Sequence, residues 1–277
     1  MTASPPQVAM QVAILGVSGR MGRALLAALD EIPGATLSGA SVSAGSQWIG
    51  QDAAQVSAKT GKSRNVLITS DPAAAVKGAT VAIDFTLPDA TASNLRACVV
   101  TGCPLVIGTT GHDDSTRTEI EQAARDIPLL VAANMSLGVN LLLKLAELAA
   151  QTLDESYDIE IFEAHHRNKK DAPSGTALAL GSAVARGREV SLTDAAEFAR
   201  QGQTGARRPG AIGFSVLRGG DVVGDHTVTF AGIGERIELT HRASDRMTFA
   251  RGALRAAQWL AGRAPGLYSM QDVLGLR

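Results

Sequence analysis

The sequence has few cysteines and no long apolar run, and each shortage removes a class of protein. Its two cysteines, Cys98 and Cys103, form neither a metal-ligand pattern nor a disulfide framework. We interpret them as small buried thiols in a reducing compartment. No uninterrupted apolar run approaches the roughly 20 residues that a helix needs to cross a bilayer. The sequence therefore predicts neither a disulfide-stabilised secreted protein nor a membrane-spanning one.

The chain also lacks an excess of charge and a recognisable targeting segment. Its 26 basic side chains nearly balance 27 acidic ones, so no overall attraction to nucleic acid or to a membrane surface is expected. The N-terminal segment has no basic stretch followed by an apolar core, as a secretory signal would have. We expect a cytoplasmic protein with no nucleic-acid or membrane partner, in which any attraction for anions is local.

The first half of the 277 residues alternates between strand-like and helix-like segments. Helices are expected at 20–30, 89–100 and 115–125. They separate apolar strands expected at 8–15, 35–42, 66–69, 79–85, 104–107 and 129–132. Buried strands separated by helices are typical of a parallel sheet that is covered on both faces. The pattern predicts an α/β protein with a Rossmann-like, doubly wound parallel sheet.

The pattern changes after Asn134. An apolar helix over 137–153 precedes longer strands expected at 158–163, 212–217, 221–230 and 236–241. Gly219-Gly220 marks a predicted hairpin turn between two of them. These strands indicate a smaller α+β domain with a mixed or antiparallel sheet, and a helix over 247–260 is expected to return to the first domain. We therefore predict one domain of residues 1–134 and 245–277 and a second of residues 135–244.

A glycine-rich turn follows the first expected strand. Gly16, Gly19 and Gly22 are spaced G-x-x-G-x-x-G, one residue off the commoner dinucleotide fingerprint. Glycine lets the backbone approach a pyrophosphate, and the start of the following helix favours negative charge. The second strand ends near Ser43 without the acid that would bind the ribose of NAD, and Arg20 could contact a 2′-phosphate. The sequence predicts a site for NADPH or NADH, with a preference for NADPH.

The stretch Glu163-Ala-His-His-Arg-Asn-Lys-Lys-Asp-Ala-Pro-Ser-Gly-Thr-Ala177 carries the most chemistry. It has two imidazoles and three cations, and Ser174 or a neighbour can open a helix that reaches Ala185. The free N–H groups of a helix start attract a carboxylate, so a compact pocket for an anion is expected here. The alternative of a metal held by Glu163, His165 and His166 is disfavoured by the adjacent cations, and no metal is predicted.

The whole stretch resembles the signature of the dihydrodipicolinate reductase family, also called 4-hydroxy-tetrahydrodipicolinate reductases. The resemblance covers nearly the whole chain. It includes Gly16-Val-Ser-Gly-Arg-Met-Gly22, Ile83-Asp-Phe-Thr86, Val106-Ile-Gly-Thr-Thr-Gly111, Ala132-Ala-Asn-Met-Ser-Leu-Gly-Val-Asn140, Gly210-Ala-Ile-Gly-Phe214, Gly224-Asp-His-Thr227 and Ser244-Asp-Arg-Met-Thr-Phe249. It implies NAD(P)H-dependent reduction of 4-hydroxy-tetrahydrodipicolinate to tetrahydrodipicolinate with loss of water, in lysine and diaminopimelate biosynthesis.

The resemblance also implies roles for particular residues and an assembly. His165 would be the proton donor and acceptor, and Lys169 a second proton donor. His166, Ser174, Gly175 and Thr176 would bind the small dicarboxylate substrate. The residues implied to bind the cofactor are Gly16, Val17, Ser18, Gly19, Arg20, Met21, Ser43, Gly108, Thr109, Thr110, Ala132, Ala133, Asn134 and Met135. Ser43 stands where many members carry an acid. The family further implies a homotetramer assembled through the sheets of the second domain.

Two other functions fit part of the sequence. A reductase of another small substrate, such as a sugar or amino-acid aldehyde, would account for the first domain but not for the cationic run before a helix start. A non-catalytic NAD(P)H sensor would bind the cofactor but would need neither His165 nor Lys169. The effect of replacing these two residues distinguishes the sensor from the enzyme.

Overall fold

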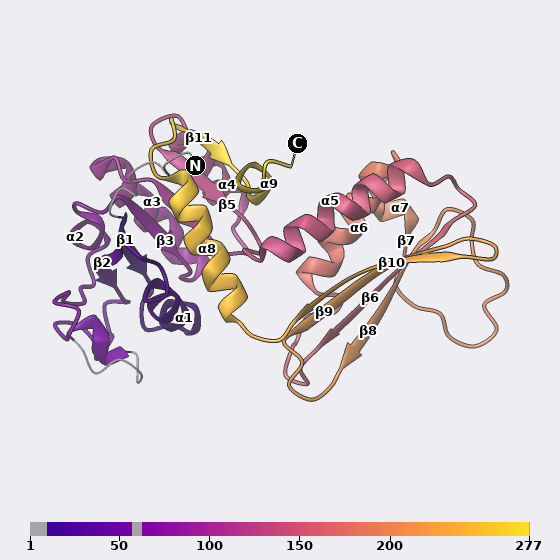
Figure 1. Ribbon diagram of the computed structural model, residues 1–277, viewed down its shortest axis with the longest axis horizontal. Helices are drawn as coiled ribbons and strands as arrows, with labels where there is room; N and C mark the ends of the chain where they lie inside the picture. The colour runs from indigo at the N-terminus through magenta and orange to yellow at the C-terminus, as the bar shows by residue number, and fades with distance from the viewer. Residues whose placement is uncertain (1–9, 57–62, 277) are drawn as a thin grey trace, which may run out of the picture. The chain divides into compact units, whose positions relative to one another are not determined.

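The computed structural model describes residues 10–56 and 63–276. Contacts divide the chain into two units, a first of residues up to 136 together with 247–275, and a second of residues 137–246. The predicted domains, 1–134 with 245–277 and 135–244, stay a prediction. Figure 1 shows each unit as a sheet with helices packed on it. Within the described residues, no helix has the length and apolar character that crossing a membrane requires.

The first unit is built on six parallel strands in the order β11-β5-β4-β3-β1-β2. They are β1 (Met10–Leu15), β2 (Ala35–Ser41), β3 (Val81–Asp84), β4 (Leu105–Ile107), β5 (Pro128–Val131) and β11 (Gly266–Tyr268). The helical segments are α1 (Arg20–Leu29), η1 (Ala53–Val56), α2 (Pro72–Val76), α3 (Pro88–Thr101), α4 (Asp114–Ala123), α8 (Met247–Leu260) and α9 (Met270–Leu274). The predicted doubly wound parallel sheet is confirmed.

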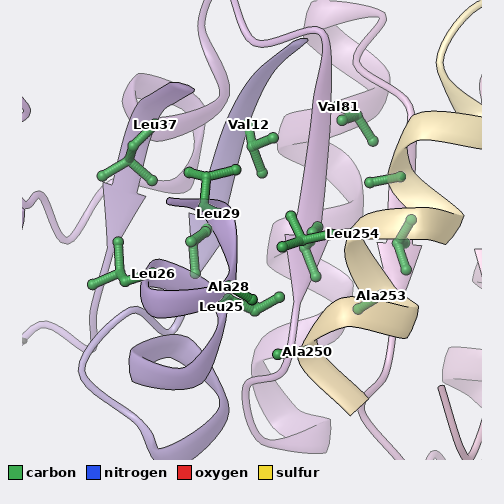
Figure 2. Packing of buried hydrophobic residues seen from close by; sticks show 14 of the residues in the cluster. Val12, Leu25, Leu26, Ala28, Leu29, Leu37, Val81, Ala250, Ala253 and Leu254 are labelled. Carbon is green, nitrogen blue, oxygen red and sulfur yellow. The ribbon is translucent and has the colours of Figure 1, made fainter. Parts of the chain in front are cut away.

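Alternate residues of each strand enter two different cores, because successive side chains of a strand point to opposite faces. Val12 and Ile14 of β1 pack with α1 and α8 in one core. Figure 2 shows this core, in which Leu25, Leu26 and Leu254 approach the sheet from the two helices. Ala13 and Leu15 pack with α2, α3 and α4 in the other. The helix predicted to return from the second domain, α8, therefore completes one face of the first sheet.

Two details of the first unit differ from the prediction. Residues 66–69 form no strand and make only isolated bridges, Ser41 to Thr69 and Asp52 to Leu67, because the edge strand β2 has ended by that point. Near the C-terminus, β11 and α9 extend the unit where no element was predicted. The strand β11 has three residues and pairs with β5 alone, which is too short for a periodic signal.

The second unit has a five-stranded mixed sheet in the order β10-β9-β6-β8-β7. Its strands are β6 (Asp158–His165), β7 (Ala196–Glu197), β8 (Ile212–Arg218), β9 (Gly224–Ala231) and β10 (Arg236–Ala243). Its helices are α5 (Leu137–Thr152), α6 (Gly175–Gly187) and α7 (Leu192–Ala195). Residues from α5 and α6 pack with Ile161, Phe214 and Phe230 in a core on one face of this sheet.

The predicted hairpin at Gly219-Gly220 is wrong. Strands β8 and β9 are not neighbours, because β6 lies between them and pairs parallel with β8 and antiparallel with β9. The glycines instead join the end of β8 to the loop after β6. The N–H of Gly219 donates to the carbonyl of His165 at 3.0 Å, and that of Arg167 donates to the carbonyl of Gly220 at 3.2 Å. The turn therefore holds the segment that carries the paired histidines.

Candidate active site

The glycine-rich turn of the first unit has the close backbone approaches that only glycine allows. Gly16 has a φ of +82°, and a Cβ there would lie 2.9 Å from Cγ2 of Thr86. A Cβ on Gly22 would lie 2.4 Å from the carbonyl oxygen of Gly16. Gly19 is the N-cap of α1 and makes no side-chain capping bond. The start of α1 is thus presented as bare backbone, which suits a phosphate.

A hollow of about 430 Å³ opens beside this turn. Of the predicted cofactor residues, Gly16, Ser18, Gly19 and Ser43 line it. Its other lining residues were not predicted to bind the cofactor; they are Ser41, Val42, Ala44, Ser70, Pro72, Phe85, Thr86, Leu87, Ala90, Ser93 and Asn94. Several of them lie at or just after the carboxyl ends of β2 and β3, and in parallel sheets these ends form the ligand edge. This rule could have identified these lining residues from the sequence.

The other predicted cofactor residues do not line this hollow. Gly108, Thr109 and Thr110 follow β4, and Ala132, Ala133, Asn134 and Met135 follow β5, at the same edge of the sheet. Val17 and Met135 are buried in the core beneath α1 and α8. Arg20 is exposed and Met21 half-buried on the first turn of α1. Contacts of these residues with a cofactor stay predictions.

A buried carboxylate fixes one wall of the hollow. Oδ1 of Asp84 accepts from the N–H of Thr86 at 2.7 Å and from its hydroxyl at 2.6 Å. Its Oδ2 accepts from the amide of Asn94 at 3.0 Å, and the hydroxyl of Thr109 donates to Oδ1 at 3.3 Å. A Cβ on Gly108 would lie 2.2 Å from the ring of Phe85. Gly108 and Thr109, which follow β4, therefore constrain the conformation of the segment 85–87.

In the second unit, the chemistry gathers at the end of β6. Glu163 and His165 are two residues apart on this strand, so their side chains lie on the same face. Nδ1 of His165 and Oε2 of Glu163 are 2.5 Å apart. Arg218, at the end of β8, donates from Nη1 to Oε2 at 2.8 Å and from Nη2 to Oε1 at 2.7 Å. Glu163 is 1% exposed and His165 9%, so this is a nearly buried ion-pair network.

The N-terminus of α6 joins the same network, as predicted for a helix opening at Ser174. The hydroxyl of Ser174 accepts from the N–H of Ala177 at 3.2 Å and lies 3.1 Å from Nε2 of His226. Its own N–H donates to Oε1 of Glu163 at 3.0 Å. Ser174 is therefore buried and structurally engaged, whereas Gly175 is exposed and Thr176 half-buried at the open end of the helix.

The remaining predicted residues lie in the loop between β6 and α6. Nζ of Lys169 is 3.0 Å from Oδ2 of Asp171, and its N–H donates to the carbonyl of His166 at 3.1 Å. His166 is half-buried, and its Nδ1 has no hydrogen-bond partner among the described residues. The structure thus joins His165 and Ser174 through Glu163. His166 and Lys169 lie in the loop between β6 and α6, and Gly175 and Thr176 begin α6.

The roles of three residues in this network were not predicted from the sequence. Glu163 was considered only as a metal ligand, although its spacing from His165 placed both on one face of the strand. Arg218 carried no signal, and His226 stood in a stretch of the family resemblance without a role, because they lie 55 residues from Glu163 and 52 from Ser174. Among the described residues no cluster of His, Cys, Asp and Glu is arranged to hold a metal ion, and Glu163 is engaged by Arg218 instead.

Burial and neighbouring charges set the protonation of these groups. Burial alone would raise the pKa of Glu163, but hydrogen bonds from Arg218, His165 and Ser174 outweigh it and lower that pKa. Burial lowers the pKa of His165; Glu163 opposes this, and Lys169 and Arg218 add to it. Burial, with a further contribution from His165, lowers the pKa of His226 to about 4. At neutral pH the network contains an ionised Glu163 and a neutral His226.

Two models of one family match nearly all of the chain. Residues 10–135 match the model described as "Dihydrodipicolinate reductase, N-terminus". Residues 138–274 match "Dihydrodipicolinate reductase, C-terminus". The chain belongs to the dihydrodipicolinate reductase family.

Curated relatives agree with this family over the full length. The 4-hydroxy-tetrahydrodipicolinate reductase of Thiobacillus denitrificans is 57% identical over 98% of this chain and 100% of its own length. That of Bordetella parapertussis is 54% identical over 100% of both chains. The chain is accordingly an NAD(P)H-dependent oxidoreductase that reduces 4-hydroxy-tetrahydrodipicolinate to tetrahydrodipicolinate with loss of water, and its family implies a place in lysine biosynthesis.

Solved structures show the same fold. A dihydrodipicolinate reductase from Paenisporosarcina sp. TG-14, solved with dipicolinate bound, has a TM-score of 0.76 at 23% identity, over 95% of this chain and 98% of that one. A biliverdin reductase from Synechocystis sp. PCC 6803, solved with biliverdin and NADP+, has a TM-score of 0.54 at 13% identity, over 96% and 95%. The fold is thus shared beyond the dihydrodipicolinate reductase family.

Proposed function

We propose that His165 and Lys169 carry the proton chemistry of this reductase, next to a dicarboxylate-binding site at the start of α6. The observation that carries the proposal is the arrangement of His165. Its Nδ1 is bound by Glu163, while its Nε2 has no hydrogen-bond partner among the described residues and lies against Gly224, where a Cβ would come within 3.0 Å of it. Nε2 is therefore the nitrogen available for proton transfer.

The substrate's own charge supports the proposed role of His165. A lowered pKa makes His165 a poor proton donor in the empty site, because little imidazolium is present at neutral pH. A bound dicarboxylate adds negative charge nearby and raises the pKa again. Proton uptake at Nε2 and substrate binding are thereby linked. The dipicolinate bound to the Paenisporosarcina enzyme supports a small dicarboxylate as the ligand of this site.

Binding of the carboxylates is proposed for His166, Ser174, Gly175 and Thr176, with Lys169 adding a positive charge. Gly175 is exposed, and no atom lies within 4 Å of where its Cβ would be. A carboxylate can therefore approach the backbone at the start of α6, where the helix dipole favours it. For Ser174 we propose an indirect contribution, since its hydroxyl caps α6 and contacts His226.

The hollow of the first unit fits a nicotinamide dinucleotide. The cofactor supplies the hydride of the reaction. Gly16, Ser18 and Gly19 would hold its pyrophosphate against bare backbone, and Ser43 would lie near the adenosine ribose. No Asp or Glu is among the described residues that line the hollow, so nothing there repels a 2′-phosphate. We propose NADPH as the preferred cofactor, with NADH also accepted.

A homotetramer assembled through the second-unit sheet is the proposed assembly. The helices α5 and α6 cover one face of that sheet. On the other, Phe162 and Leu217 are 41% and 44% exposed, and large apolar side chains in a solvent-facing sheet favour an interface. Light scattering at the elution peak of a sizing column tests the assembly; the mass of a single chain would overturn it.

We also propose a cytoplasmic location, which fits the free thiols of Cys98 and Cys103.

The decisive experiment follows nicotinamide absorbance while an upstream synthase makes the substrate from pyruvate and aspartate semialdehyde. NADPH and NADH are compared in parallel, with wild type and with His165→Gln. We expect the variant to lose about 10²–10⁴-fold in kcat, the usual contribution of a general acid, with unchanged cofactor affinity. Wild-type turnover by His165→Gln would overturn the role of His165, and equal kcat/KM for the two cofactors would overturn the NADPH preference.

A further inference from the structure

The carboxylate of Glu163 is the centre of the second-unit network, although it lies behind His165. It accepts from four donors on three segments: two nitrogens of Arg218, Nδ1 of His165 and the N–H of Ser174. With 1% of its surface exposed, it has little access to water. Such a buried carboxylate is tolerated only because these donors are in place.

The ionisation of Glu163 decides which ring nitrogen of His165 carries the proton. A carboxylate can only accept hydrogen bonds, so the nitrogen that faces it, Nδ1, must be the donor. In the neutral imidazole the other nitrogen, Nε2, is then unprotonated. It lies against the bare α-carbon of Gly224. The geometry leaves Nε2 ready to take a proton from solvent and pass it to the substrate.

Arg218 links the same carboxylate to the loop that carries Lys169. Besides its two bonds to Glu163, Nη2 of Arg218 donates to the carbonyl of Asp171 at 2.7 Å. The side chain of Asp171 in turn pairs with Lys169. Planar, two-pronged pairing with a carboxylate is geometry that arginine provides and lysine does not. Arg218 therefore positions both the carboxylate and the loop.

We propose that Glu163, with Arg218 as its counterion, is a positioning residue that holds His165 in the Nδ1–H tautomer and directs Nε2 to the substrate. The proposal rests on the proposed role of His165 as the proton donor. Glu163 touches no substrate in it and acts only through His165. This explains why an acid precedes the paired histidines by two residues in the strand.

The charges around His165 predict the direction in which its pKa shifts when Glu163 is replaced. Four groups face the ring: Glu163 from the same strand, Arg218 from β8, His226 from β9 and Lys169 from the following loop. Only Glu163 is negative. Replacing it with glutamine removes the one charge that favours the imidazolium, so the pKa of His165 falls further. Because a donor must be protonated, the alkaline limb of the kcat profile should move to lower pH.

The test compares wild type, Glu163→Gln and Glu160→Gln. Glu160 is the matched control, because it lies on the same strand but pairs with Arg200 and Arg207, away from His165. For Glu163→Gln we expect about a 10²-fold loss in kcat, at the lower end of a general acid's contribution. The alkaline limb should shift to lower pH, and the KM for cofactor should stay unchanged. A kcat and pH profile like those of Glu160→Gln would overturn the proposal.

A second measurement reads the wild-type protein and does not depend on the folding of Glu163→Gln. Nitrogen-15 NMR of histidine-labelled wild type reports the tautomer of His165 directly, with His165→Gln identifying its signals. We expect a protonated Nδ1 and an unprotonated Nε2 in the neutral ring, and a neutral ring protonated at Nε2 with a bare Nδ1 would overturn the proposal. Arg218→Lys, which keeps the cation, should lose less activity than Arg218→Met, and equal losses would remove Arg218 from the proposal.

The two proposals fail in different ways. If His165→Gln keeps wild-type turnover, the role of His165 is wrong, whatever its tautomer. If His165→Gln is inactive but Glu163→Gln keeps the wild-type kcat and pH profile, His165 is the donor and Glu163 does not position it. The NMR result separates these cases because it does not depend on turnover.

Discussion

The sites proposed in the two units differ in the kinds of side chain that surround them. In the first, the hollow is lined by glycine, hydroxyl and apolar side chains and the amide of Asn94, and no ionisable side chain is among its described lining residues. In the second, the site around α6 is dense with ionisable groups, including Glu163, His165, Lys169 and Arg218. A cofactor that is only held needs shape and backbone dipoles. A substrate that must exchange protons needs groups whose charge can change.

The difference predicts how each unit responds to substitution. In the first unit, changes act through steric fit, so they should alter cofactor affinity and stability with little effect on the pH dependence of turnover. In the second, changes act through charge, so they should alter turnover and its pH dependence while cofactor affinity is kept. The comparison would fail if a variant in the first unit changed the pH dependence of turnover, or if a variant in the second changed cofactor affinity.

The largest effect is expected from Lys169→Ala. We expect kcat to fall by about 10²-fold or more, because both a positive charge near the carboxylates and a proposed proton donor are lost. Cofactor affinity should remain that of wild type. Lys170→Ala is the control, since Lys170 is the exposed neighbour of the same charge and should keep nearly full activity. Steady-state kinetics decide, and unchanged turnover in Lys169→Ala would refute the assignment.

Gly22→Ala should have the next largest effect and should act through packing. The new Cβ would lie 2.4 Å from the carbonyl oxygen of Gly16 and 2.5 Å from that of Val17, so the backbone of the phosphate turn must move. We expect a loss of about 1–3 kcal/mol in the free energy of unfolding and weaker cofactor binding. Gly45→Ala is the control, since no atom lies within 4 Å of its Cβ position. Urea unfolding and fluorescence titration of NADPH measure both effects; wild-type affinity in Gly22→Ala would contradict them.

The pH dependence of stability should reveal the buried histidine. His226 has a pKa of about 4 in the folded protein and about 6.5 when unfolded. Well above pH 6.5, His226 is neutral in both the folded and the unfolded protein, so it does not change the free energy of unfolding there. As pH falls from 6.5 towards 4, the unfolded state takes up the proton first and stability is lost. Between pH 6.5 and 5 the loss is about 2 kcal/mol.

Urea unfolding at pH 7 and pH 5 measures this loss. In His226→Gln the acid-dependent loss should shrink by about that amount, although the variant starts from lower stability because Ser174 loses its partner. Parallel pH curves for wild type and His226→Gln would show that His226 is not the group responsible.

The smallest effect is expected from Ser43→Glu. A carboxylate at the edge of the hollow would repel a 2′-phosphate, so we expect kcat/KM with NADPH to fall by about tenfold, as for a like-charge contact of roughly 1.4 kcal/mol. The value with NADH should change little. Thr36→Glu, at an exposed position near the other end of β2, controls for the added charge. An equal loss with both cofactors would mean that Ser43 does not lie near the 2′ position.

Local pattern was enough to predict most of the first unit. The buried strands β1 to β5 read as apolar runs, and the glycine turn follows β1 because a phosphate turn needs residues without side chains. The start of α6 was also predictable, since Ser174 is a favourable N-cap. These features depend on neighbours in the sequence. The pattern failed at 66–69, where an apolar run follows the edge of the sheet without joining it.

Contacts between distant segments could not be predicted in this way. In the second sheet, β6 lies between β8 and β9. No local sequence pattern indicates that an earlier strand lies between two later ones. This strand order brings Arg218 and His226 to either side of Glu163 and His165. The donors that make a buried carboxylate tolerable therefore became visible only with the fold. The sequence predicted which residues react, and only the fold showed which groups surround those residues.

The division of the first unit between the two ends of the chain bears on how the protein is made. Translation delivers residues up to 136 early, but α8, whose Ala253 and Leu254 complete the core over α1, follows only after the whole second unit. Domains usually fold in the order of their synthesis. Here the second unit is complete on the ribosome while the first still lacks one of the two long helices, α1 and α8, that pack on one face of its sheet. A stalled or truncated chain ending before 247 would therefore expose Val12, Leu26 and their neighbours to chaperones and proteases.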